Sequence, residues 1–309
     1  VQAKHPPELG LKTNVYLFSG NGSIIWKYPV NNECWGADVR DNLFVASSHD
    51  RSVYVFNRKG LLFNLAGPSL IRVAKFSRDG RYLATGPIFD SDVALIDVNT
   101  GRKVWGVNVC RDWLRSIAFT EDDSLVICGF RNGHLVAIDK SGNVIWHEYT
   151  GEFPMYLEAS NGLIYAGGKS RTLFVFYYNG TLKWKLRIPD HVISDGKVLS
   201  DGSVVIGTVG GWIYRISKDG KILWRNCIIG IVSSVDASRD FIAVSTMQRN
   251  EIFILNKRGT ILWSYKATPK PLNDKMLIGA TNIHISQDSS RIVAGYGDSY
   301  IRMFKIRRP

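Results

Sequence analysis

The residues of this chain that could act in catalysis or bind a metal are few and widely spaced. The six histidines have no metal-ligand spacing among them: His5, His49, His134, His147, His191 and His284. The cysteines form no CxxC pair, no GxSxG nucleophile elbow occurs, and GNGS at 20–23 lacks the strand–loop–helix context of a phosphate loop. No motif therefore indicates a catalytic site, and an enzyme whose site is scattered over several segments stays an open alternative.

Tryptophan and arginine point instead to an interaction surface, since both are enriched in interface anchors. Three of the nine tryptophans, Trp35, Trp113 and Trp212, lie outside a repeated phrase that contains the other six. We expect them on one partner-binding face with these residues: Arg72, Arg111, Arg115, Arg131, Tyr156, Arg171, His191 and Arg249. The alternative is that Trp35 and Trp113 are buried between neighbouring sheets.

An internal repeat defines the elements that must position these residues. The phrase DGKILW at 219–224 recurs at intervals of 37 to 42 residues. Its counterparts are NGSIIW at 21–26, TGRKVW at 100–105, SGNVIW at 141–146, NGTLKW at 179–184, RGTILW at 258–263 and, with Phe63 in place of Trp, KGLLFN at 59–64. A period of this length indicates a repeat architecture.

Each repeat predicts a four-stranded antiparallel sheet. Residues 71–109 contain four short runs rich in Val, Ile, Leu and aromatics, each closed by turn residues. The Gly of the phrase supplies the positive φ of a hairpin between the third and fourth strands, and the aromatic residue four positions later offers apolar surface to bury. Such sheets bury both faces by stacking radially on their neighbours.

The predicted fold class is therefore an all-β, seven-bladed β-propeller of four-stranded antiparallel blades. Seven first-and-second strand pairs are expected near 35–48, 71–86, 114–129, 155–168, 193–208, 232–245 and 280–297. We expect an N-terminal strand near 24–30 to complete the last blade and close the ring; eight blades is the alternative if part of a longer chain is missing. The predicted organisation is an N-terminal extension over 1–13 and one propeller domain over 14–309.

The face that carries the three tryptophans consists of loops from strand four to the next strand one and from strand two to strand three. The longest connection of this class is ATPKPLNDKMLIG at 267–279, and long, deviant loops on a regular scaffold often carry binding.

Aligning the first strands predicts a charged lining of a central channel. The column contains Asp38, Lys75, Glu158, Asp236 and His284, with Ala118 and Val198 at the remaining positions. Isolated buried charges are costly, so these groups should pair with one another or contact water. A channel-bound cation is the sharper alternative; otherwise no cofactor is expected.

The repeated phrase resembles the quinoprotein-like propeller repeat with its Gly-x-x-x-Trp docking motif, and VAKFSRDGRYLATG at 73–86 is similar to the first two strands of WD40-type repeats. The resemblance covers about residues 14–306. Quinone-dependent dehydrogenases of this family are longer and carry adjacent cysteines, which this chain lacks, so no cofactor residues are transferred. The resemblance to non-catalytic members, from outer-membrane assembly and cell surfaces, implies a protein-interaction platform.

Composition sets the remaining expectations. The chain has 309 residues, 45% of them hydrophobic, and a formal net charge of +12 without long blocks of like charge. A protein partner is the first expectation, followed by a glycan bound on exposed tryptophans, an enzyme of the quinoprotein or another propeller type, and nucleic acid. We expect a monomer with no transmembrane segment and free cysteines. Sparse Glu and the surface-propeller resemblance favour an extracytoplasmic or cell-surface location without defining the compartment.

Overall fold

The structure is a computed structural model that describes residues 13–88, 91–151, 153–189, 191–268, 280–286, 288–296 and 300–306. These residues contain strands and turns and no helix, so no helix that could cross a membrane is found among them. Two compact units share the chain: Val1–Ile164 with Phe176–Leu182 (unit 1), and Tyr165–Val175 with Lys183–Pro309 (unit 2).

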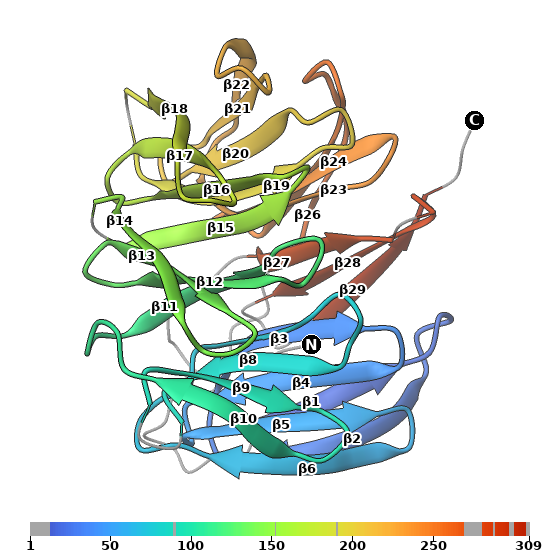
Figure 1. Cartoon of the computed structure of the whole chain (residues 1–309). Helices are drawn as coiled ribbons and strands as arrows, with labels where there is room; N and C mark the ends of the chain where they lie inside the picture. The colour runs from blue at the N-terminus through green and yellow to red at the C-terminus, as the bar shows by residue number, and fades with distance from the viewer. Residues whose placement is uncertain are drawn as a thin grey trace. The chain divides into compact units, whose positions relative to one another are not determined.

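Unit 1 begins with a two-stranded sheet and continues with three four-stranded antiparallel sheets (Figure 1). The first two sheets contain β1 (Thr13–Phe18) and β2 (Ile24–Val30), then β3 (Cys34–Arg40), β4 (Leu43–Ser48), β5 (Ser52–Asn57) and β6 (Gly60–Ala66). The next two contain β7 (Val73–Phe76), β8 (Tyr82–Gly86), β9 (Val93–Asp97) and β10 (Arg102–Val107), then β11 (Leu114–Phe119), β12 (Leu125–Phe130), β13 (His134–Asp139) and β14 (Val144–Tyr149).

The division between the units passes through the next four-stranded sheet. Its strands are β15 (Pro154–Ser160), β16 (Leu163–Gly168), β17 (Thr172–Tyr177) and β18 (Leu182–Arg187).

Unit 2 continues with two four-stranded sheets and a sheet of three described strands. The four-stranded sheets contain β19 (Ile193–Val198), β20 (Val204–Thr208), β21 (Trp212–Ile216) and β22 (Ile222–Cys227), then β23 (Ile231–Ala237), β24 (Phe241–Met247), β25 (Glu251–Asn256) and β26 (Ile261–Lys266). The last sheet contains β27 (Ala280–Ile285), β28 (Arg291–Tyr296) and β29 (Ile301–Lys305).

All seven predicted first-and-second strand pairs are present, and the all-β, seven-bladed propeller of antiparallel blades is confirmed. The first strand of a sheet contacts the first strand of the next within each unit, from β3 to β7, β11 and β15, and from β19 to β23 and β27. The segment expected to complete the last blade, β2, pairs with β1 instead, because the Asn21-Gly22 turn joins the two strands into a local hairpin. A single domain over 14–309 stays a prediction.

Apolar side chains lie between consecutive sheets, as a stacked repeat requires. One cluster joins the sheet of β3 to that of β7 through Val53, Ile71 and Ile96, which are fully buried. A comparable cluster in unit 2 joins the sheet of β19 to that of β23 through Val205 and Val244. The core is thus a series of similar inter-sheet layers.

The repeated phrase connects most of the consecutive sheets; Trp26 is an exception, since its Nε1 atom is buried without a hydrogen-bond partner in the described part of the chain. Trp146 on β14 stacks over Gly180 in the β17–β18 turn, and its Nε1 atom donates a hydrogen bond to the Tyr178 carbonyl at 2.8 Å. The same bond recurs from Trp105 to Lys140 at 3.1 Å, from Trp184 to Lys218 at 2.9 Å and from Trp224 to Lys257 at 3.0 Å. Phe63 packs on Gly101 in the equivalent place, as the shifted phrase predicted. The phrase recurs because glycine leaves room for the aromatic ring of the preceding sheet.

Candidate functional site

Two exposed tryptophans and an arginine form the centre of the candidate site, which lies within unit 1. Trp35 is the second residue of β3, Arg72 directly precedes β7, and Trp113 directly precedes β11. The Arg72 Cζ atom lies 4.6 Å from the ring centroid of Trp35 and 5.1 Å from that of Trp113. Arg72 therefore makes cation–π contacts that join three consecutive sheets at their first strands.

A second arginine holds Trp113 from the end of β12. The Arg131 Cζ atom lies 4.9 Å from the Trp113 ring centroid, and the Arg131 backbone N–H donates to the Trp113 carbonyl at 2.8 Å. The Arg131 Nε atom also lies 3.5 Å from Asp112 Oδ1. Trp113 is thus fixed by backbone and side-chain contacts together.

Both tryptophans remain accessible to a partner. Trp35 is 39% exposed and Trp113 is 49% exposed, so the alternative that they are buried between blades is wrong. Trp35 also stacks on His49, with ring centroids 4.7 Å apart, and its Nε1 atom donates to Glu33 Oε2 at 3.0 Å. Rings held in place before binding lose little conformational entropy when a partner docks.

Arg115 on β11 adds a third cation to the site. Its Cζ atom lies 4.4 Å from the ring centroid of Phe153, and its Nε atom is buried without a hydrogen-bond partner in the described part of the chain. Burial, followed by repulsion from Arg72, lowers the pKa of the Arg115 guanidinium to about 10, so it stays charged at neutral pH. We call Trp35, Arg72, Trp113, Arg115 and Arg131 the tryptophan–arginine cluster.

Two residues outside the cluster set its backbone geometry. A Cβ atom at Gly36 would lie 2.7 Å from the Arg72 carbonyl oxygen, so glycine allows the segment before β7 to approach β3. Asp92 Oδ2 accepts hydrogen bonds from the backbone N–H groups of Val109, Cys110 and Arg111 at 2.8–3.0 Å. This carboxylate orders the loop that leads into Trp113.

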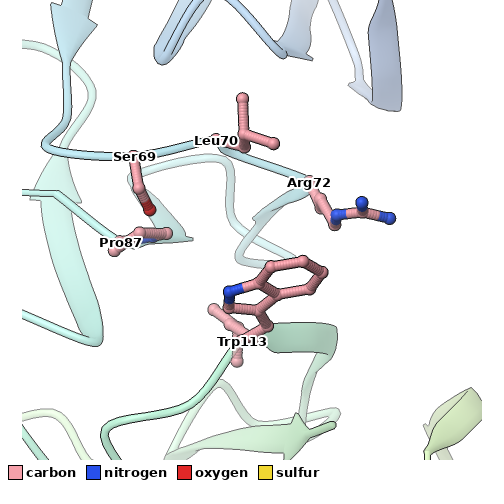
Figure 2. Close-up of a pocket in the computed structure, with 6 residues that line it drawn as sticks. Ser69, Leu70, Arg72, Pro87 and Trp113 are labelled. Carbon is pink, nitrogen blue, oxygen red and sulfur yellow. The ribbon is translucent and has the colours of Figure 1, made fainter.

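A small hollow opens beside Arg72 and Trp113. Figure 2 shows the Trp113 indole flanked by Pro87 and Arg72, with Ser69 and Leu70 on the adjoining segment; Leu114 completes the lining. Its volume is about 80 Å³, far below the roughly 300 Å³ at which sites for drug-sized ligands begin. The hollow therefore has room for a side chain rather than for a cofactor.

The other residues predicted for the partner-binding face do not join the cluster. Tyr156 is buried, at 3% exposure, and its hydroxyl donates to Glu158 Oε2 at 3.0 Å, so its side chain is not presented to a partner as expected. Arg111 is exposed in the loop ordered by Asp92. Four more belong to unit 2, where the described structure shows no aromatic or ionic contact among them: Arg171, His191, Trp212 and Arg249. The expected binding loop is outside the described residues from 269 to 279.

Each unit contains one close pair of charged residues from the column of the first strands. Lys75 Nζ lies 3.2 Å from Asp38 Oδ1, and the Phe76 backbone N–H donates to Asp38 Oδ2 at 3.0 Å. His284 Nδ1 lies 3.5 Å from Asp236 Oδ2.

The register of β19 corrects one position of this column. Lys197 pairs with Val205 as Asp236 pairs with Ala243, so Lys197 occupies the position expected for Val198. Val198 is buried at the next position. Within the described residues, no group of three metal-ligating side chains could hold a cation.

One close pair of functional groups was not apparent from sequence spacing. His134 Nδ1 and His147 Nε2 lie 2.7 Å apart on neighbouring strands β13 and β14. Burial, and then the charge of His134, lowers the pKa of His147. The two residues are 13 positions apart, and only the cross-strand register brings them together.

Comparison with known proteins identifies the repeat. A family model described as the outer membrane protein assembly factor BamB matches residues 90–191 and 177–307. The outer membrane protein assembly factor BamB of Moranella endobia (strain PCIT) is 29% identical over 143 residues, which cover 42% of this chain and 37% of that relative. The match thus spans well under half of the relative's length.

A solved structure shares the fold. The crystal structure of the computationally designed Ika8 protein superposes with a TM-score of 0.81 at 16% identity, covering 96% of this chain and 91% of the designed one. At that identity the likeness concerns the fold alone. Because the family match extends over most of the chain, this protein belongs to the PQQ-repeat β-propeller family described by the outer membrane protein assembly factor BamB.

Proposed function

We propose that the chain is a non-enzymatic platform that binds a protein partner through the tryptophan–arginine cluster. The observation that supports this most directly is Arg72 held between two accessible indoles, 4.6 Å and 5.1 Å from their centroids. Tryptophan and arginine dominate the binding energy of protein interfaces when they are pre-positioned in this way. The name of the matched family, a protein assembly factor, supports a protein partner in the same direction.

A glycan partner is less well supported by the geometry. Sugars bind tryptophan by stacking on an open ring face, whereas guanidinium groups lie over the rings of both Trp35 and Trp113. A sugar would have to displace these cation–π contacts. Binding on a glycan array that is abolished by Trp113→Ala would favour the glycan partner over the protein.

The test compares charge reversals at the half-buried Arg72 and at the exposed Arg58. Arg72→Glu removes the central cation of the cluster, and Arg58→Glu makes the same change in the β5–β6 turn. Each variant is immobilised, exposed to a native extract, and chemically cross-linked, and retained proteins are quantified by mass spectrometry. We expect Arg72→Glu and Trp113→Ala to reduce partner retention at least about tenfold, with Arg58→Glu unchanged.

Melting temperatures of the same variants separate binding from folding. The proposal expects Arg72→Glu and Trp113→Ala to melt within a few degrees of the wild type, since both side chains are at least partly exposed. Equal retention by Arg72→Glu and the wild type would overturn the proposal. A parallel loss of retention and melting temperature would show that the residues act in the core instead.

A further inference from the structure

The tryptophan–arginine cluster contains more positive than negative charge. Asp112 is engaged by Arg131, with Nε and Oδ1 3.5 Å apart. Among the described residues, no carboxylate lies within ion-pair distance of Arg72 or Arg115. Within the part of the chain that the structure describes, these two neighbouring guanidinium groups therefore have no anionic partner.

Arg115 makes this imbalance costly for the free protein. Its Nε atom is buried without a hydrogen-bond partner among the described residues, and its guanidinium lies over Phe153. Arg115 is half-buried, and cations withdrawn from water are normally paired and hydrogen-bonded, because their desolvation is otherwise uncompensated. An orphaned donor next to an exposed binding surface indicates a group that an incoming ligand satisfies.

The hollow beside Arg72 has the size and lining for one acidic side chain. Its volume of about 80 Å³ matches a short side chain. Leu70, Pro87 and Leu114 offer apolar walls for the methylene groups, and Arg72 supplies a charged rim. A planar guanidinium that is held by two indoles suits a planar carboxylate, with which arginine forms paired hydrogen bonds.

We propose that this hollow is a socket for an aspartate or glutamate side chain of the partner, whose carboxylate accepts hydrogen bonds from Arg72 at the rim and whose charge offsets that of the neighbouring Arg115. The socket rests on the proposed function, because it assigns the chemistry by which the same surface recognises a protein. It also assigns a reason for an arginine in β11 that has no carboxylate partner among the described residues. In the free protein the desolvation of the Arg115 guanidinium is not offset by a described carboxylate, and the carboxylate of the bound partner would offset it.

The first test uses defined peptides and fluorescence polarisation. A fluorescein-labelled octapeptide of alternating glutamate and leucine is compared with one in which glutamine replaces every glutamate. We expect the glutamate peptide to bind the wild-type chain at least about tenfold tighter than the glutamine peptide. Arg72→Gln should abolish this preference and Arg115→Met should weaken it, whereas Arg58→Gln, in the β5–β6 turn, should keep it.

The second test measures the melting temperature of Arg115→Met. The socket predicts that this substitution weakens binding of the glutamate peptide without lowering the stability of the free protein. Arg115→Met keeps an unbranched side chain over Phe153 but removes the unpaired cation, so its melting temperature should equal or exceed that of the wild type. A weaker preference of Arg115→Met for glutamate together with undiminished stability supports the socket. A clear drop in melting temperature for Arg115→Met would contradict the view that Arg115 is uncompensated, and Arg72→Gln would then still test the preference for glutamate.

Two results would contradict the socket while leaving the proposed function intact. One is equal affinity for the glutamate and glutamine peptides while Trp113→Ala still loses the native partner. The other is preferential binding of a phosphoserine peptide over the glutamate peptide, which would assign the site to phosphate. If Trp113→Ala retains the native partner, the proposed function itself fails.

Discussion

At the scale of single residues, Asp195 shows how a buried carboxyl couples stability to pH. Its Oδ2 atom accepts a hydrogen bond from the Val235 backbone N–H at 2.9 Å, which joins β19 to β23. Burial raises the pKa of Asp195 to about 6, although this and other hydrogen bonds act in the opposite direction. The native state therefore holds the proton more tightly than the unfolded state. Its stabilising contribution is complete below about pH 4 and is lost as pH rises through about 6.

Asp195→Asn is expected to stabilise the protein at pH 7.5. Asparagine keeps an oxygen that accepts the Val235 N–H but cannot ionise, so the cost of a buried charge disappears. We expect a gain of about 2 kcal/mol in the free energy of unfolding at pH 7.5, shrinking towards pH 5. Urea denaturation of both proteins at pH 7.5 and pH 5 measures this gain. A gain of the same size at the two pH values would contradict the raised pKa of Asp195.

Asp236→Asn provides a matched control of opposite sign. Burial alone would raise the pKa of Asp236, but the hydrogen bond and charge of His284 lower it below its usual value. The ionised form is thus the stabilising one, and its contribution is present at neutral pH and lost as pH falls through the lowered pKa. Asp236→Asn should therefore destabilise the protein at pH 7.5, and the loss should diminish in acid.

At the scale of structural elements, the aromatic–glycine contact joins consecutive blades in addition to the apolar layers between them. A Cβ atom at Gly180 would lie 2.7 Å from the Trp146 ring, and Gly180 has a φ of +86°. Gly162, in the β15–β16 turn, has a similar φ of +73°, but a Cβ atom there would meet nothing within 4 Å. Comparing alanine substitutions at the two positions therefore separates the backbone strain of alanine at positive φ from the cost of displacing the Trp146 ring.

Gly180→Ala should destabilise the protein more than Gly162→Ala. Both substitutions incur about 1–2 kcal/mol for a left-handed backbone, and Gly180→Ala adds roughly 1–3 kcal/mol of overpacking against Trp146. Thermal denaturation and the intrinsic fluorescence of the tryptophans measure the difference. Equal destabilisation by the two variants would mean that the ring moves away freely and that the contact does not join the blades.

The sequence predicts these hairpins well because their signal is local. Glycine, the turn and the aromatic residue lie within six positions, so the phrase at 179–184 is sufficient to place the turn on which Trp146 docks. Register within the first strands is not local in this sense. Aligning the first strands by sequence places Val198 of β19 in the charged column, whereas the pairing of β19 with β20 places Lys197 there, one position earlier.

The candidate site shows the same contrast between local and non-local signals. Trp35 and Trp113 are recognisable because they depart from the repeat. Arg72 contacts both rings only because Gly36 allows β3 and β7 to approach each other closely. The loop before Trp113 is ordered by hydrogen bonds to Asp92, which lies 17 to 19 positions away in the sequence. Neither contact has a sequence motif, so the participants of the site could be named but their arrangement could not.

At the scale of the whole molecule, charge determines how an acidic partner approaches. The formal net charge is +12, and its basic residues are distributed along the chain rather than gathered in a tail. A field of this kind raises the rate of encounter with an acidic partner, and salt screens it over about 8–10 Å at physiological ionic strength. The contacts of the tryptophan–arginine cluster act at shorter range, after encounter, and so govern dissociation.

Stopped-flow kinetics with the glutamate peptide should separate these two contributions. Raising salt from about 20 mM to about 150 mM should slow association several-fold or more while changing dissociation little, because screening acts mainly on encounter. Arg115→Met, which removes only one of 39 basic side chains, should instead speed dissociation with a small effect on association. If salt and Arg115→Met changed the same rate constant to the same extent, the cluster would act through general charge alone, and the specific role of Arg115 would be lost.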